Sequence, residues 1–145
     1  TNLWINVFSQ DMAAGTDILW RSVIGPQESV CLIHPGSGSD GKCWSLDHFH
    51  AITELVLGQK LKPVFLLGPA EKQRLSEQDI QKIQTIAPLL TDLSLENVLS
   101  VLSCAECFVG NDSGISHLAG AMGKKTIAIF GPSNPAQYRP LGPNV

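Results

Sequence analysis

The 145-residue sequence lacks long apolar runs, so we expect no membrane-spanning helix within it. A transmembrane helix needs about 20 consecutive apolar residues, whereas the apolar runs here, such as residues 30–34, are far shorter. No secretory signal opens the sequence. Hydrophobic residues still make up 43% of the chain, which is typical of a globular domain with a buried core.

Positive charge is also scarce. The 10 Lys and Arg residues are outnumbered by 13 Asp and Glu residues, so the net charge is −3, and no basic block is present. Nucleic-acid-binding proteins concentrate Lys and Arg on one surface. The sequence therefore predicts no nucleic-acid partner, and any anion site must use a few local donors.

Cysteine is too rare for a disulfide scaffold, since the chain has four. Cys104 and Cys107 form a C-x-x-C pattern, but a redox motif would start a helix and a zinc site would add a second pair. Neither is present, so packing roles and a reducing cytosol are favoured. Carboxylates at metal-ligand spacing are missing too, so no metal and no other cofactor is expected.

Short apolar strands alternate with helical patterns along most of the chain. This alternation predicts an α/β fold: a Rossmann-like parallel sheet with helices on both faces. We expect strands at residues 30–34, 63–67, 89–93, 106–109 and 126–130. We expect helices at residues 11–24, 45–58, 70–86, 94–103 and 115–123, and a surface loop over the tail at 132–145.

The loop after the first strand, PGSGSDGK, has the composition of an anion site. Its glycines, Gly38 among them, let backbone N–H groups approach a ligand, Ser37 adds a hydroxyl, and Lys42 adds a charge suited to phosphate. The Walker pattern fails because Cys43 stands where Ser or Thr would hold magnesium. An ordinary tight turn is the alternative interpretation.

Glu71, in the segment GPAEKQR, lies at the start of a predicted helix. A first-turn carboxylate stabilises a helix through its dipole, which is the structural interpretation. The functional alternative is that this carboxylate accepts hydrogen bonds from the vicinal hydroxyls of a ribose.

The segment GNDSGISH connects the fourth strand to the next helix. Backbone N–H groups and the dipole at that helix start favour an anion. Ser113 and His117 are four residues apart and share a helix face, so His117 is positioned to donate to a phosphate oxygen. It could instead be half-buried and bonded to a carbonyl. Asp112 should cap the helix, pair with Lys42, or accept a sugar hydroxyl.

Because the carboxyl ends of parallel strands meet at one sheet edge, these three loops should meet there. Together they predict a ligand with an anionic phosphate and a hydroxylated sugar, either a nucleotide or a nucleotide sugar. A nucleoside-phosphate hydrolase on the same fold would need an acidic cluster that the sequence lacks.

The segments HPGSGSDGKCW, GPAE and FVGNDSGISHLAGAMGKKTIAIFGPSNP resemble the C-terminal half of glycosyltransferase family 9, which contains the ADP-heptose:lipopolysaccharide heptosyltransferases. The resemblance covers about residues 30–142. It implies a GT-B architecture of two Rossmann-like domains and inverting, metal-independent transfer. By resemblance, the residues that contact the nucleotide-sugar donor are Ser37, Gly38, Lys42, Glu71, Asp112, Ser113, Gly114 and His117.

The resemblance also implies a division of the enzyme. We expect residues 1–29 to be an N-terminal segment or inter-domain connection, and residues 30–145 to be the donor-binding domain. The sequence starts at Thr1 without Met, so we expect a domain cut from a longer enzyme. The catalytic base, and binding of a glycolipid acceptor of the lipopolysaccharide-core type, would belong to the absent domain, with none of the catalytic residues in this chain.

The family implies a cytoplasmic enzyme at the inner face of the bacterial inner membrane, compatible with peripheral membrane association. A non-catalytic nucleotide or sugar-nucleotide binding module is the alternative function.

Overall fold

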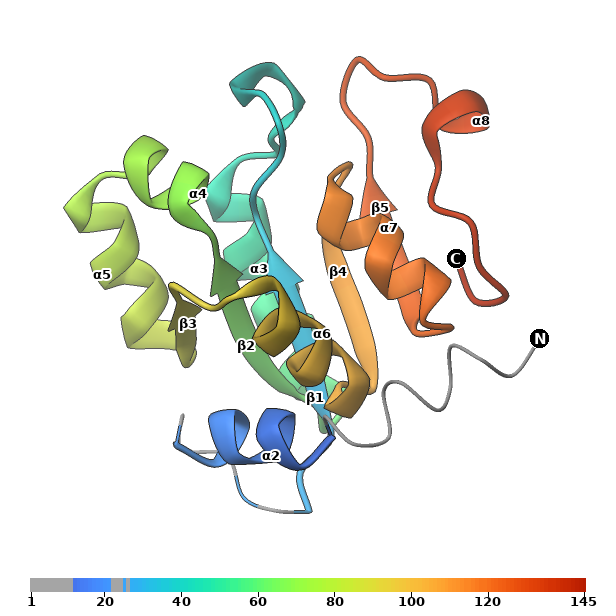
Figure 1. The fold of residues 1–145 in the computed structure, drawn as a ribbon. Coiled ribbons are helices and arrows are strands. Elements are labelled where there is room, and N and C mark those ends of the chain that lie inside the picture. The colour runs from blue at the N-terminus through green and yellow to red at the C-terminus, as the bar shows by residue number, and fades with distance from the viewer. Residues whose placement is uncertain (1–11, 22–24, 26) are drawn as a thin grey trace.

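The protein is built on a five-stranded sheet in which every pair of neighbouring strands is parallel (Figure 1). The computed structural model describes residues 12–21, 25 and 27–145. The strand order is β3-β2-β1-β4-β5, the order of a Rossmann-like half. The strands are β1 (Val30–His34), β2 (Lys62–Leu67), β3 (Leu89–Thr91), β4 (Cys107–Asn111) and β5 (Lys125–Ile129).

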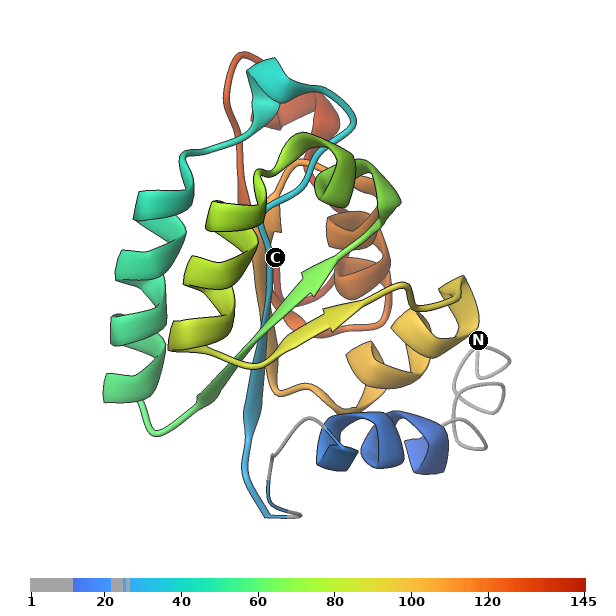
Figure 2. The same cartoon turned by 90° about the vertical axis from the view of Figure 1, so that its left-hand side faces the viewer.

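Helices cover both faces of this sheet (Figure 2). On one face lie α3 (Leu46–Gly58) and α5 (Glu77–Ile86), and on the other lie α2 (Met12–Arg21), α6 (Leu95–Cys104) and α7 (Gly114–Ala121). Three shorter helices follow strands: η1 (Asp40–Lys42), α4 (Pro69–Arg74) and α8 (Pro135–Tyr138).

The central strands are apolar throughout because both of their faces are buried. All five residues of β1 are buried. Leu32 and Phe108 face the core layer under α2, α6 and α7, while Ile33 and Phe65 face the layer under α3 and α5. Alternate residues of one strand therefore stabilise two separate helix layers.

The direction of strand addition reverses between β1 and β4, which pair in register from Cys31 with Cys107 to His34 with Gly110. The connections that follow β1 and β4 run to opposite faces of the sheet, so a crevice opens between them at the carboxyl ends of the two strands. The loops at residues 35–45 and 112–113 flank this crevice and lie at the top of the molecule in Figure 1.

Most expected elements are confirmed, with shifts of a few residues at their ends. The single helix expected at 70–86 is wrong: Leu75 and Ser76 separate α4 from α5, because the Ser76 hydroxyl caps α5 by accepting from the Asp79 N–H. The tail expected as a loop contains α8. In the helix expected at 11–24, residues 11 and 22–24 lie outside the described residues.

Candidate functional site

An ion pair joins the two loops that flank the crevice between β1 and β4. Lys42 Nζ, at the end of the glycine-rich loop, lies 3.4 Å from Asp112 Oδ2, directly after β4. The Asp112 side chain is 9% exposed and that of Lys42 is 40% exposed. The predicted pairing of these residues is confirmed, and it leaves the lysine accessible to a ligand.

Further hydrogen bonds tie the same two loops together. The Ser37 hydroxyl donates to the Asp112 carbonyl at 2.8 Å. Asn111, which is fully buried, donates to the Pro35 carbonyl at 2.8 Å and accepts from the Trp44 N–H at 3.1 Å. The glycine-rich loop is thus held against the end of β4 before any ligand binds, which lowers the ordering cost of binding.

The start of α7 opens beside this ion pair. Ser113 is the N-cap, and its hydroxyl accepts from the Ser116 N–H. His117 Nε2 lies 3.9 Å from Asp112 Oδ1, and the His117 side chain is 49% exposed. Its backbone N–H donates to the Ser113 carbonyl. The histidine is therefore accessible near the helix start, and not buried in the core.

Glu71 approaches from the other side of the crevice. It is 5% exposed, and its Oε2 accepts the Gly68 N–H at 2.8 Å, which caps α4. A Cβ atom added to Gly36 would overlap the Glu71 carboxylate. Glycine is therefore required at position 36 so that this carboxylate can lie beside the loop. The Glu71 carboxylate thus caps α4 and also lies directly beside the glycine-rich loop.

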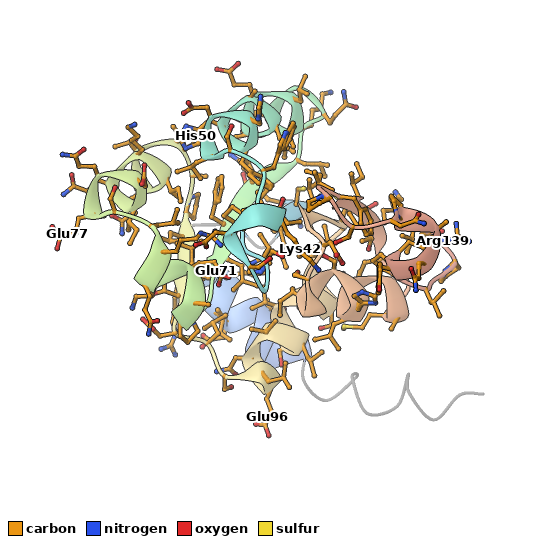
Figure 3. All side chains as sticks on the ribbon, turned by 90° about the horizontal axis from the view of Figure 1, so that it is seen from above. Lys42, His50, Glu71, Glu77, Glu96 and Arg139 are labelled. Carbon is orange, nitrogen blue, oxygen red and sulfur yellow. The ribbon has the colours of Figure 1, made fainter. Side chains whose placement is uncertain are left out.

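These loops enclose a cavity of about 330 Å³, which is within the usual size range of small-molecule sites. Ser37, Gly38, Glu71, Ser113 and Gly114 all line it. Its remaining wall is largely apolar: Leu66, Leu67, Ala70, Leu93, Val98 and Ile115. Seen from above the strand ends, Lys42 and Glu71 lie near the middle of the molecule (Figure 3). The structure thus brings five of the predicted residues to one cavity. Lys42, Asp112 and His117 lie together at the start of α7 but are not among the residues that line this cavity.

Arg74 supports the site, although the sequence does not single it out. From the end of α4 it donates to the Pro35 carbonyl at 3.2 Å and to Cys43 Sγ at 2.8 Å, and it lies 3.6 Å from Asp40. These contacts cover both ends of the glycine-rich loop. The sequence gives little indication of this role of Arg74, because each contact joins residues that are more than 30 positions apart.

His34 and Asn111 are the other residues that sequence reasoning missed. Each is the last residue of a buried strand at the crevice. A polar side chain at that position is a signal in itself, because the carboxyl ends of parallel strands are where ligands bind. His34 lines the cavity, and its Nδ1 lies 2.9 Å from the Leu66 carbonyl. Burial, the largest cause, lowers the pKa of His34 below its usual value.

Other site classes find little support in the part of the chain that the structure describes. There, three or more His, Cys, Asp or Glu residues never gather as metal ligands, and no helix is long and apolar enough to cross a membrane. Cys31, Cys43 and Cys107 form no disulfide among the described residues. Cys104 ends α6 and Cys107 begins β4, so the C-x-x-C pair does not start a helix.

Known proteins share both the sequence and the fold. Lipopolysaccharide heptosyltransferase 1 of Escherichia coli K12 is 28% identical over 106 residues, covering 72% of this chain and 33% of that protein. A crystal structure of a family 9 glycosyl transferase from Veillonella parvula has TM-score 0.77 at 20% identity, covering 90% of this chain and 38% of that one. The structure of the E. coli heptosyltransferase WaaC with ADP has TM-score 0.69 at 25% identity, and the match covers 81% of this chain and 36% of that one.

The chain thus spans about a third of the length of these relatives. The likeness to the Veillonella structure supports the Rossmann-like α/β fold expected from the strand-helix alternation. The sequence profile of glycosyltransferase family 9 (heptosyltransferase) matches residues 10–145, which is nearly the whole chain. The resemblance seen in the sequence is therefore confirmed, and the protein belongs to glycosyltransferase family 9.

Proposed function

We propose that this chain is the donor-binding domain of a heptosyltransferase-like glycosyltransferase and binds a nucleoside-diphosphate sugar such as ADP-heptose. The observation that carries the proposal is the meeting of Lys42, Asp112 and His117 at the start of α7, whose first residues Ser113 and Gly114 line one cavity with Glu71. Membership of family 9 and the relative solved with ADP support a nucleotide-sugar ligand.

The diphosphate would bind at the start of α7. The backbone N–H groups at Ser113 and Gly114 and the helix dipole favour an anion there. Lys42 and His117 supply nearby cationic or N–H donors, and Ser37 and Gly38 line the cavity from the opposing loop. Asp112 pairs with Lys42 and lies beside His117, and Glu71 would accept from the ribose.

The reaction that this arrangement favours is direct displacement at the anomeric carbon. An acceptor hydroxyl attacks that carbon, and the bond to the nucleoside diphosphate breaks. Lys42, His117 and the start of α7 would stabilise the negative charge that develops on the leaving diphosphate. Because side chains and a helix start supply this stabilisation, we propose that a divalent metal is not required.

The remaining parts of the proposal concern the whole enzyme. A second Rossmann-like domain, in a GT-B arrangement, would bind a lipopolysaccharide-core-type acceptor and supply the carboxylate that removes the proton from the attacking hydroxyl. The reaction would take place in the cytoplasm, at the inner face of the bacterial inner membrane. On this proposal the chain by itself binds the donor without transferring sugar.

Isothermal titration with ADP, adenosine and inorganic pyrophosphate, each in the presence of EDTA, tests the donor site. We expect ADP to bind more tightly than adenosine or pyrophosphate, because only ADP engages both the phosphate side and the Glu71 side of the cavity. Equal affinity for ADP and adenosine would contradict a diphosphate site, and loss of ADP binding in EDTA would contradict metal independence.

A further inference from the structure

Two cysteines lie opposite each other on β1 and β4, at the end of these strands that is farther from the cavity. Cys31 and Cys107 are register partners, and the same ladder ends with His34 beside Gly110 at the crevice. Side chains alternate between the two faces along a strand, and both cysteines belong to the core layer under α3 and α5. The two thiols are therefore neighbours on one face of the sheet.

The spacing of this cysteine pair suits a covalent bond. Neighbouring strands lie about 4.8 Å apart, and disulfides join residues whose Cα atoms are roughly 4.4–6.8 Å apart. Because the side chains share a face, their Cβ atoms do not point away from each other, which is the second requirement. Cys104, in contrast, packs against the core layer on the opposite face of the sheet, although it is closer to Cys107 in the sequence.

The two thiols differ in access and in acidity. Cys31 is fully buried, whereas Cys107 is partly exposed as the first residue of β4. A hydrogen bond from the Cys31 thiol lowers the pKa of Cys107, and the same bond together with burial raises the pKa of Cys31. Because the thiolate is the reactive form of cysteine, Cys107 is the one of the two that a dissolved oxidant oxidises first.

An exposed ion pair lies beside Cys107. Lys125 is the register partner of Cys107 on β5, and its Nζ lies 2.7 Å from Glu106 Oε1. Lys125 lowers the pKa of the thiol and Glu106 raises it, so the two charges act in opposite directions. Both side chains of the pair extend into solvent. Small uncharged oxidants can therefore reach the thiol at this end of the sheet.

We propose that Cys31 and Cys107 are a reversible dithiol–disulfide pair that reacts with hydrogen peroxide. The Cys107 thiolate attacks one peroxide oxygen and the O–O bond breaks, which gives a sulfenic acid and a hydroxide that takes up the proton released by Cys107. The Cys31 thiol then attacks the sulfenic sulfur, so that an S–S bond forms, the S–O bond breaks and a second water leaves. The two thiols lose two electrons, and the peroxide gains them.

The pair protects the sheet from irreversible damage. A sulfenic acid that finds no second thiol is oxidised further to sulfinic and sulfonic acids, which thiols do not reduce. Either acid would place a negative charge at the edge of the core layer that contains Cys31. A disulfide adds no charge there and ties together the two strands whose far ends position the loops of the site. The proposal does not depend on which ligand the cavity binds.

Peptide mapping of the folded wild type tests the proposal. The chain is treated with hydrogen peroxide, its remaining thiols are blocked with iodoacetamide, and it is cleaved with trypsin and a glutamate-specific protease. Cleavage after Glu106 puts Cys104 and Cys107 on separate peptides. We expect residues 29–42 linked to residues 107–124, a loss of two of the four thiols, and recovery of both with dithiothreitol.

Variants assign the roles of the two thiols. In Cys31→Ser, we expect Cys107 to stop at a sulfenic acid that dimedone traps, and in Cys107→Ser the buried Cys31 should stay reduced. Cys43→Ser is the matched control, because it removes another partly exposed thiol and should form the link as fast as the wild type.

Three results would overturn the proposal: no link in the wild type, a link that includes Cys43 or Cys104, or equal oxidation of Cys31 when Cys107 is absent. The first two are read from the wild type alone, so they do not depend on how well a variant folds.

Discussion

Lys42 and Asp112 form an ion pair across the point where the sheet reverses its order, with 3.4 Å between Nζ and Oδ2. The residues are 70 positions apart, and the pair joins the loop after β1 to the loop after β4. The same carboxylate lies 3.9 Å from His117. A nearly buried carboxylate thus lies beside two more exposed side chains, a lysine and a histidine, that a diphosphate can reach.

Lys42→Ala should weaken ADP binding by about 1–3 kcal/mol, the range of a hydrogen bond to a charged group. Calorimetry measures the change. Lys82→Ala is the matched control, because Lys82 is exposed on α5 and the substitution removes the same charge. An equal loss in both variants would show that only net charge matters, and an unchanged affinity in Lys42→Ala would remove the lysine from the site.

His117→Ala should also weaken ADP binding by about 1–3 kcal/mol if its ring donates to a phosphate oxygen. Adenosine is the control ligand, since it lacks the diphosphate and should bind the variant and the wild type alike. Equal weakening for both ligands would instead mean that the substitution disturbs α7.

Gly36→Ala should destabilise the fold by about 1–3 kcal/mol, because the added methyl group overlaps the Glu71 carboxylate and forces the loop or the carboxylate to move. Urea denaturation measures the free energy of unfolding. Gly41→Ala is the control from the same loop, where a Cβ atom meets nothing within 4 Å. Similar stability of the two variants would contradict the close approach of Glu71.

Arg74→Ala should loosen the glycine-rich loop, because its guanidinium donates to Pro35 and Cys43 at the two ends of the loop. Hydrogen exchange at residues 36–43 should become faster, while exchange in β1 stays slow. Arg21→Ala, which removes an exposed ion pair with Asp17 on α2, should leave the loop unchanged. Unaltered exchange in Arg74→Ala would show that Asn111 and Lys42 hold the loop without it.

Asp79 gives a pH-dependent test of the break between α4 and α5. The hydroxyl and the backbone N–H of Ser76 lower the pKa of Asp79 below its usual value of 3.8. A lowered pKa stabilises the folded state above pH 3.8, and this stabilisation is lost as the pH falls through the folded-state pKa. Asp79→Asn should therefore be less stable than the wild type at pH 7, with a smaller difference at pH 2.5. A pH-independent difference in urea midpoint would contradict the cap.

Local patterns in the sequence were sufficient to predict the strands and the loops at the site. Buried parallel strands read as apolar runs, and Gly, Ser and Asp mark the turns and helix starts that follow. Because each of these loops follows a parallel strand, Lys42, Glu71 and Ser113 could be predicted to lie at the same edge of the sheet. The break at Ser76 was missed because the residues on both sides of it suit a helix, and its signal is a capping box.

Contacts made by distant segments could not be predicted in the same way. Arg74 reaches Pro35 across 39 positions, and Asn111 reaches it across 76, so nothing in the neighbouring residues indicates either contact. The contact of the His34 ring with the Leu66 carbonyl likewise joins two strands that are 32 positions apart. The division at residue 29 and the donor roles of the site residues remain predictions.

The most direct test of the account is a crystal structure of this chain with ADP. The account predicts the diphosphate at the start of α7, within hydrogen-bond distance of Lys42 Nζ and the Ser113 and Gly114 backbone, and the ribose hydroxyls against Glu71. ADP bound away from the β1–β4 crevice, or with its diphosphate against Glu71 and its ribose at α7, would contradict the account.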